Sequence, residues 1–268
     1  MRVPLAVRAI PTVAERAWFT PPRRPREHTQ SSDPVPGRPI QLTVSGKPLR
    51  GFEMGEGPLV VLAHGWGGTA ASLSRMARAI AKARFKAVAL DAPGHGSDRQ
   101  TTSDLFQMAA TLGAVVEEYG DPRAVVAHSL GAMASLVAFE DAPPPRAVFL
   151  APGLDVNQLL DTFSARARLL PWTSRSLRRR IRRFVGERWA TVSAGSDLAW
   201  GDTSLLVIHD PDDQQTHFHA SAALAAKRPD TRLVVAQGLG HRGVLEDPEI
   251  VDRIVRFIAE EQTTPTSR

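Results

Sequence analysis

A serine stands between an apolar run and a stretch of small residues in VVAHSLGA, residues 125–132. The apolar, β-branched run predicts a buried strand, and the residues after Ser129 predict a helix. A hydroxyl at such a junction can serve as an N-cap that accepts a hydrogen bond from the first helical turn. It can also serve as a nucleophile in a sharp strand-to-helix turn, which small neighbours such as Ala127 and Gly131 permit. The pentapeptide alone leaves both roles open.

A glycine-rich segment, HGWGG at residues 64–68, follows the first long apolar run. Glycines allow a turn that directs backbone N–H groups into a cleft. We expect the N–H groups of Trp66 and Leu130 to face one point, where each would stabilise an oxyanion by about 3 kcal/mol. The alternative is a plain glycine turn. A phosphate-binding loop is not predicted, because no Gly-Lys-Ser/Thr sequence follows.

Two later segments carry carboxylates and an imidazole. IHDPDD (208–213) ends one apolar run, and GLGH (238–241) follows the last one. If these runs are parallel strands, Asp213 and His241 lie at the same sheet edge as Ser129. The simpler interpretations are a solvated turn for the aspartates and a surface position for the histidine. The chain order of serine, acid and histidine is the order found in α/β hydrolases.

Strand-like and helix-like patterns alternate along most of the chain. The predicted strands are 58–65, 85–91, 123–129, 146–153, 203–210 and 231–238, and the predicted helices are 69–83, 102–119, 130–140, 217–227 and 248–260. A hairpin is predicted around Ser45 and Gly46. This alternation predicts an α/β fold, with a mostly parallel sheet and helices on both faces.

The chain is predicted to divide into an arm, a core, a cap and a tail. The arm is 1–37, the core is 38–153 with 201–262, the cap is 154–200, and the tail is 263–268. The arm is rich in proline and arginine, with a helix near 12–19. The cap interrupts the alternation and is expected above the carboxyl edge of the sheet. Its sequence LRRRIRRFVGERW predicts an amphipathic helix with a basic face.

The chain resembles the α/β-hydrolase superfamily, among its carboxylesterase, lysophospholipase and thioesterase-like members. The resemblance covers about residues 40–260 and rests on HGWGG, DAPGHGSD (91–98), AHSLGA, HDPDD and GLGH, in the family's order. It implies Ser129 as nucleophile, His241 as general base and Asp213 as the acid of a triad. The competing acids are Asp212, Asp210 and Asp155. The chain departs from the family pattern at Ala127 and Asp210, where relatives have glycine.

These roles imply a serine hydrolase that cleaves a carboxylic ester through an acyl-enzyme and needs no cofactor. An acyl thioesterase or an acyltransferase on an anionic carrier would use the same residues, and a non-catalytic binding protein could share the fold. We expect His64, Gly65 and His128 to line the substrate pocket. No metal site is predicted, because His217 and His219 have no third ligand at suitable spacing.

The composition limits where the protein is expected to be located and which partners it is expected to bind. The chain has 268 residues and no cysteine, which excludes thiol catalysis and disulfide scaffolds. It has no apolar run of about 18 residues and no secretory signal pattern, so no transmembrane segment and a cytoplasmic location are expected. The net charge is +5, and arginine clusters at 21–26 and 174–188 hold a large share of the basic residues. Such local clusters do not predict a nucleic-acid partner. The partner that we expect is a small acyl ester. The basic face of the Arg-rich cap is either solvated or meets an anionic surface or carrier, and the sequence leaves both interpretations open.

Overall fold

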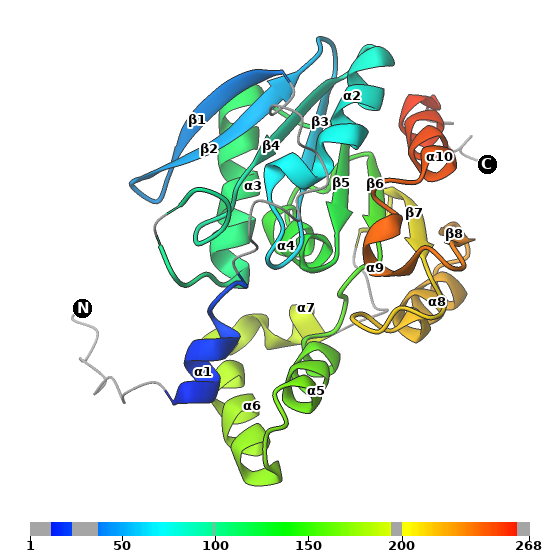
Figure 1. The fold of residues 1–268 in the computed structure, drawn as a ribbon. Coiled ribbons are helices and arrows are strands. Elements are labelled where there is room, and N and C mark those ends of the chain that lie inside the picture. Colours follow the sequence, from blue (N-terminus) through cyan, green and yellow to red (C-terminus); the bar gives the residue numbers. More distant parts are fainter. Residues whose placement is uncertain (1–11, 23–36, 99, 194–199, 262–268) are drawn as a thin grey trace.

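The computed structural model describes residues 12–22, 37–98, 100–193 and 200–261. In these ranges eight strands form one sheet, in the order β1-β2-β4-β3-β5-β6-β7-β8 (Figure 1). The strands are β1 (Arg38–Val44), β2 (Lys47–Met54), β3 (Leu59–Ala63), β4 (Lys86–Leu90), β5 (Ala124–His128), β6 (Arg146–Leu150), β7 (Ser204–His209) and β8 (Arg232–Val235). The pairs β1–β2 and β2–β4 are antiparallel, and the other neighbouring pairs are parallel. The predicted α/β fold is confirmed.

Burial explains why the central strands are continuous apolar runs. Every residue of β3, β5 and β6 is buried, as expected for parallel strands with helices on both faces. The edge strand β1 instead alternates between exposed and more buried residues. Its antiparallel partner β2 is joined to it at Ser45 and Gly46, as the hairpin pattern predicted.

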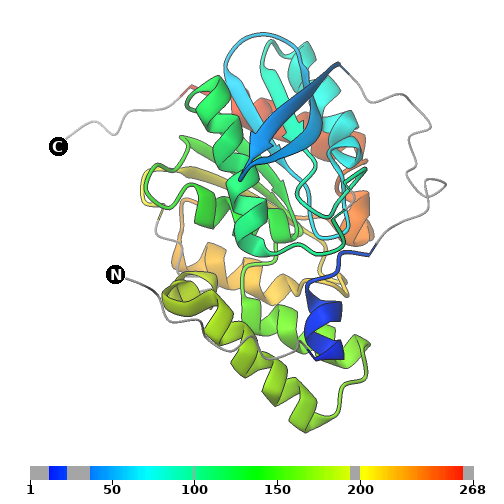
Figure 2. The same ribbon diagram turned by 90° about the vertical axis from the view of Figure 1, so that its left-hand side faces the viewer.

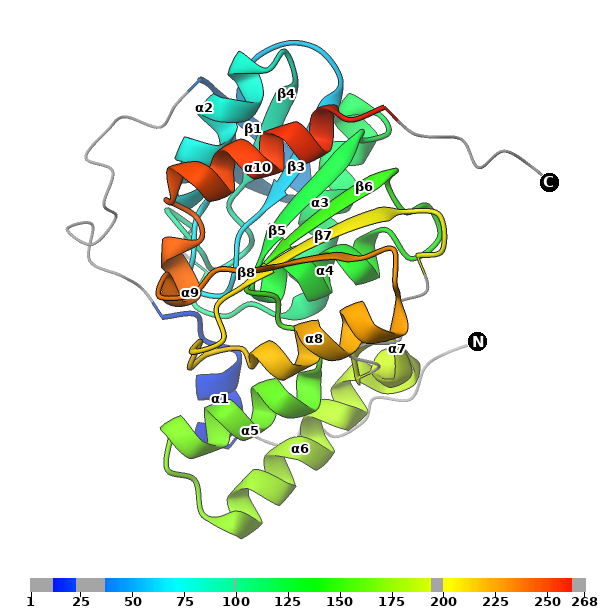
Figure 3. The same ribbon diagram turned by 90° about the vertical axis from the view of Figure 1, so that its right-hand side faces the viewer.

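Helices cover the two faces of the sheet with separate apolar cores (Figure 3). On one face lie α2 (Ser74–Lys82) and α10 (Pro248–Ala259), which bury Met76 and Ile254 against the strands. On the other face lie α3 (Leu105–Tyr119), α4 (Leu130–Ala138) and α8 (Phe218–Lys227). The short helix α9 (Gly240–Gly243) follows β8. Both faces of the parallel strands are therefore sealed, and their carboxyl edge carries the loops.

Local capping moves several element boundaries from their predicted positions. The predicted helix 102–119 begins only at Leu105, because the carboxylate of Asp104 accepts a hydrogen bond from the N–H of Gln107 at 2.9 Å and caps it. The predicted helix 69–83 begins as a 3₁₀ turn, η2 (Ala70–Leu73), before α2. The predicted strand 231–238 is limited to the four residues of β8.

Between β6 and β7 the chain forms α5 (Val156–Arg166), α6 (Pro171–Val185), η3 (Gly186–Arg188) and α7 (Trp189–Ser193). These helices lie beyond the carboxyl edge of the sheet (Figures 1 and 2). Leu160, Leu177 and Ile181 pack there with Met133 and Val137 of α4 in a third buried cluster. None of the helices in the described ranges is long and apolar enough to cross a membrane.

The predicted helix near 12–19 is present as α1 (Val13–Trp18), and it packs against α5 and α6. Glu15 forms an ion pair with Arg180 of α6 at 3.1 Å, and the Trp18 ring contacts Phe163 of α5 edge to face. Residues 1–11 and 23–36 of the predicted arm, 194–199 of the predicted cap and all of the tail, 263–268, lie outside the described residues. The division into arm, core, cap and tail stays a prediction.

Gly131 lets α4 approach the chain that leaves β3. A Cβ atom at this position would lie 2.7 Å from the carbonyl oxygens of both Ala63 and His64, a distance that real Cβ contacts do not reach. Because both contacts are backbone atoms, a side chain here cannot be accommodated by rotamer changes. The position of the first turn of α4, and of the serine before it, therefore depends on a glycine.

We expect Gly131→Ala to destabilise the protein by about 1–3 kcal/mol, because the added methyl group forces α4 away from β3. The matched control is Gly113→Ala in α3, where an added Cβ meets nothing within 4 Å. That change should leave the free energy of unfolding unchanged or raise it by about 0.5–1 kcal/mol. Urea unfolding of both variants measures the difference, and equal stabilities would contradict the packing argument.

Candidate active site

Ser129 occupies a strained turn between β5 and α4. Its φ of 54° and ψ of −123° lie in a region that residues other than glycine rarely adopt. The backbone on both sides is anchored, since the Ser129 N–H donates to the carbonyl of Leu150 at 2.9 Å and the Ser129 carbonyl accepts from the N–H of Gly153 at 3.0 Å. Its side chain makes no capping hydrogen bond to α4. The N-cap interpretation of this hydroxyl is therefore wrong.

The hydroxyl instead belongs to a chain of hydrogen bonds across the sheet edge. Nε2 of His241 lies 3.0 Å from Oγ of Ser129, and Nδ1 of the same ring lies 2.7 Å from Oδ2 of Asp213. Ser129 follows β5, Asp213 lies in the loop after β7, and His241 lies in α9 after β8. The Asp213 side chain is fully buried, the His241 side chain is 8% exposed, and Ser129 is partly exposed. The structure thus brings these three residues together.

The three competing carboxylates do not contact the imidazole of His241. Asp155 is the N-cap of α5 and accepts a hydrogen bond from the N–H of Asn157 at 2.8 Å. Asp212 is exposed. Asp210 is buried, and its two carboxylate oxygens accept hydrogen bonds from the N–H groups of Asp212 and Gly240. Asp213 is therefore the one of the four candidates that contacts the imidazole of His241.

Asp210 also accounts for a departure from the family pattern. Its carboxylate joins the loop after β7 to Gly240, the residue that immediately precedes His241. A glycine at position 210 could not make this bond. The carboxylate thus holds the acid-bearing and imidazole-bearing loops in a fixed relation.

Two further residues surround Asp213, and sequence reasoning did not single them out. The imidazole of His209 is fully buried, with Nε2 3.4 Å from Oδ2 of Asp213. Oγ1 of Thr216 lies 3.0 Å from the same oxygen. Although burial opposes ionisation, hydrogen bonds from His209 and His241 hold the pKa of Asp213 well below its usual value. The sequence indicates a role for His209 and Thr216 only through their positions, because they flank the aspartates at the end of β7.

The glycine-rich segment 64–68 packs directly on Ser129. A Cβ atom on Gly65 would lie 2.7 Å from Cβ of Ser129 and 3.0 Å from Nδ1 of His128. The N–H groups of Trp66 and Leu130 have no hydrogen-bond partner within residues 12–22, 37–98, 100–193 and 200–261. Leu130 follows Ser129 in the sequence, and Trp66 follows Gly65, which packs on the serine. Their convergence on one oxyanion stays a prediction.

The residues predicted to line the pocket lie beside Ser129 but are buried. The His64 ring has both nitrogens engaged: Nδ1 donates to the carbonyl of Gly65 at 2.8 Å, and Nε2 accepts from the N–H of Ala92 at 3.0 Å. Nε2 of His128 donates to the backbone carbonyl of His241 at 2.8 Å. His128 therefore positions the loop that carries His241. A direct contact of His64, Gly65 or His128 with substrate stays a prediction.

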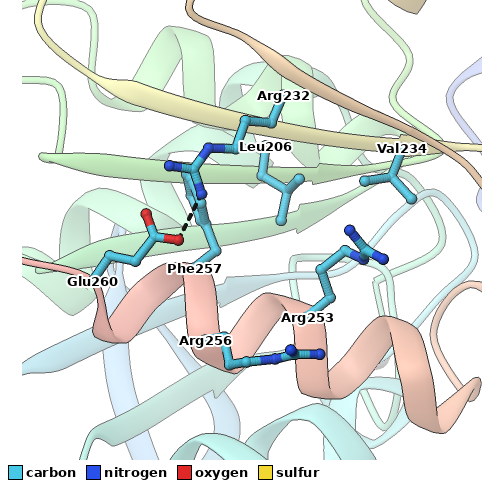
Figure 4. Close-up of a pocket in the computed structure, with 7 residues that line it drawn as sticks. All are labelled: Leu206, Arg232, Val234, Arg253, Arg256, Phe257 and Glu260. Carbon is cyan, nitrogen blue, oxygen red and sulfur yellow. Dashed lines mark hydrogen bonds and ion pairs between the residues drawn. The ribbon is translucent and has the colours of Figure 1, made fainter.

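A hollow of about 240 Å³ lies away from these residues, between α10 and strands β7 and β8 (Figure 4). It is lined by Leu206, Arg232, Val234, Arg253, Arg256, Phe257 and Glu260. Arg232 is paired with Glu260 at 2.6 Å, so part of its positive charge is compensated. Because neither Ser129 nor His241 lines this hollow, it is not where a substrate would meet the serine.

The described residues contain no group of three or more His, Asp or Glu side chains placed to hold a metal ion. His217 is instead the N-cap residue of α8, although its side chain makes no capping bond. The ring of the intervening Phe218 contacts His209 edge to face, with centroids 5.8 Å apart. His217 and Phe218 therefore belong to the start of α8 and to its packing on the sheet.

Burial makes His128 a source of acid sensitivity. Burial, and then the neighbouring His241, lower the pKa of His128 to about 3, whereas an unfolded histidine titrates near 6.5. Below pH 6.5 the unfolded chain therefore binds a proton that the folded chain does not, and stability falls as the pH decreases toward 3. His64 acts in the same direction, because burial lowers its pKa to about 4.

We expect His128→Gln to flatten the decline of unfolding free energy between pH 6 and 4 by about 1.4 kcal/mol per pH unit. Glutamine keeps an N–H donor for the carbonyl of His241 but cannot titrate. Urea unfolding of the wild type and the variant at several pH values provides the measurement. An unchanged slope would show that the ring of residue 128 is not held neutral by burial.

Comparisons with known proteins identify the family of this chain. Residues 60–254 match the Alpha/beta hydrolase family. The Magnesium-chelatase 30 kDa subunit of Rhodobacter capsulatus is 34% identical over 104 residues, which are 37% of this chain and 36% of that protein. Pimeloyl-[acyl-carrier protein] methyl ester esterase of Methylococcus capsulatus is 37% identical over 89 residues, which are 33% of this chain and 34% of that protein. The chain thus spans about a third of the length of these curated relatives.

Similarity to solved structures extends over nearly the whole chain. An esterase of Pyrococcus furiosus superposes with a TM-score of 0.64 at 17% identity, covering 90% of this chain and 97% of that one. Rv0554 of Mycobacterium tuberculosis has the same TM-score at 20% identity, covering 84% of this chain and all of that one. At such identities the likeness establishes the fold. Since the family match covers most of the sequence, the chain belongs to the alpha/beta hydrolase family.

Proposed function

We propose that this protein is a serine hydrolase that cleaves a carboxylic ester through an acyl-enzyme. The observation that carries the proposal is the hydrogen-bonded chain from Oγ of Ser129 through the ring of His241 to Oδ2 of Asp213. The strained backbone of Ser129 supports it, because strain of this kind is found where a nucleophile is held out of the sheet. The esterases among the structural neighbours are consistent with it.

In the first half-reaction, Oγ of Ser129 attacks the carbonyl carbon of the ester, and its proton passes to Nε2 of His241. Asp213 accepts the N–H on Nδ1, which holds the ring in the required tautomer and stabilises the imidazolium. The negative charge on the former carbonyl oxygen would be met by the N–H groups of Trp66 and Leu130. When the intermediate collapses, the C–O bond to the alcohol breaks and His241 returns the proton to the departing oxygen.

In the second half-reaction, water takes the place of the alcohol. His241 accepts a proton from the water as its oxygen attacks the acyl carbon. The new intermediate collapses by releasing Oγ of Ser129, which recovers its proton from His241. The products are a carboxylic acid and the free enzyme, and water is the only co-reactant in these steps.

A second candidate is hydrolysis or transfer of an acyl group carried on a protein. One curated relative is named as an esterase of a pimeloyl-[acyl-carrier protein] methyl ester, and the cap here is rich in arginine. The other curated relative is named as a subunit of magnesium chelatase, which keeps a non-catalytic binding role open. The small acyl ester as substrate and the cytoplasmic location stay predictions.

We expect Ser129→Ala to lower kcat/KM for p-nitrophenyl butyrate by about 10⁴-fold or more, because no other group can form the acyl-enzyme. Asp213→Asn should lower it by about 10³–10⁴-fold, since the amide favours the wrong histidine tautomer. Initial-rate kinetics of the purified variants test both values.

The matched control is Asp212→Asn, which removes the adjacent but exposed carboxylate. It should retain activity within about threefold of the wild type. Equal losses in Asp212→Asn and Asp213→Asn would contradict the assignment of the acid. Wild-type activity retained by Ser129→Ala would contradict the proposed function itself.

A further inference from the structure

The loop that joins α5 to α6 lies at the end of the cap farthest from the sheet (Figures 1, 2 and 3). Two large apolar side chains are exposed there, Leu170 at 53% and Trp172 at 63%. Leu170 is the N-cap residue of α6, a position that favours Ser, Thr, Asp or Asn, and it makes no capping bond. These apolar side chains therefore neither cap α6 nor contribute to the buried core of the described residues.

The outer face of α6 continues from Trp172 as a row of arginines. Arg175, Arg179 and Arg183 follow it at intervals of three and four residues, which places all of them on one side of the helix. The opposite side carries Leu177, Ile181 and Val185, which are buried in the cap cluster. The row and its apolar end thus face away from the body of the protein.

Two other cap arginines form ion pairs within the protein, whereas no acidic partner for this row is found among the described residues. Arg178 pairs with Asp161 at 2.5 Å, and Arg180 pairs with Glu15 at 3.1 Å. Within the described ranges, Arg175, Arg179 and Arg183 have no acidic partner, and all of them are exposed. Residues 156–193 contain nine arginines but only Asp161 and Glu187 as acids. The field at this face is therefore strongly positive.

We propose that this face of the cap, made of Leu170, Trp172, Arg175, Arg179 and Arg183, docks on a lipid bilayer that contains anionic headgroups. Tryptophan and leucine at an exposed tip can bury their apolar surface at the boundary between headgroups and acyl chains. Arginines beside them can bind the phosphates of the lipids. A protein carrier would be matched by the charge alone. The exposed apolar tip favours the bilayer, and docking there would set the cap against the phase that holds lipid-like esters.

Co-sedimentation with vesicles tests the proposal without any need for catalysis. The probes are vesicles of phosphatidylcholine alone and vesicles in which about a third of the lipid is phosphatidylglycerol. The wild type should bind the anionic vesicles at least about 100-fold more tightly than the neutral ones, and raising the salt to about 0.5 M should weaken this binding. An absence of binding to anionic vesicles would overturn the proposal.

Variants separate the face from the net charge. Arg175→Gln, Arg179→Gln and Arg183→Gln combined should weaken anionic-vesicle binding on the order of 100-fold. Leu170→Ser with Trp172→Ser should weaken binding to the same vesicles by about tenfold. The control combines Arg50→Gln, Arg84→Gln and Arg253→Gln, which removes the same charge from exposed positions outside the cap. Equal weakening by the control would overturn the proposal.

Two further readouts keep the outcomes distinct. Hydrolysis of p-nitrophenyl butyrate should be unchanged in every variant, because none of these residues belongs to the candidate active site. If the wild type does not hydrolyse the ester, the vesicle result still stands by itself. If the triple arginine variant loses binding to an acyl carrier protein while vesicle binding is unaffected, the face serves a protein and the bilayer proposal is wrong.

Discussion

The hydrogen bond between Ser129 and His241 is possible only because the backbone of Ser129 is held in a conformation that it would not adopt alone. A φ of 54° costs roughly 1–3 kcal/mol for a residue with a side chain. The surrounding fold imposes it from several sides. Gly65 packs so closely on Cβ of Ser129 that a larger residue would clash with it. Gly131 packs equally closely on the backbone carbonyls of Ala63 and His64. The carbonyl of Leu150 accepts a hydrogen bond from the serine N–H.

The parallel sheet supplies the remaining partners by bringing the carboxyl ends of β5, β7 and β8 to one edge. The loops that leave these strands are then joined to each other. Asp210 bonds to Gly240, and His128 bonds to the carbonyl of His241. Two contacts of the backbone around His241 are thus made by groups from other strands. We infer that the position of the imidazole is set by the sheet edge and does not depend on α9 alone.

Much of the fold and of the candidate site could be predicted from the sequence, because both depend on periodicity and on short segments with strong steric demands. The continuous apolar runs predict buried parallel strands, and AHSLGA, HDPDD and GLGH predict which strand ends carry Ser129, Asp213 and His241. The ends of helices and of β8 were less predictable, since a single capping side chain such as Asp104 decides them.

The choice between neighbouring carboxylates could not be made from the sequence. Asp210, Asp212 and Asp213 lie within four residues, and which of them meets the imidazole depends on the path of the loop after β7. The roles of His209 and Thr216 around Asp213 depend on the same path. The exposure of Leu170 and Trp172 could not be predicted either. An amphipathic pattern shows which side of a helix is buried, but it does not show where the end of the helix lies relative to the rest of the protein.

The most direct test of a reactive serine held by His241 is covalent labelling of the folded protein with a fluorophosphonate, followed by mass spectrometry of its peptides. We expect one phosphonyl adduct per chain, on Ser129, and its loss in His241→Ala. An intact, folded protein that takes up no label, or a label on a different residue, would contradict the account.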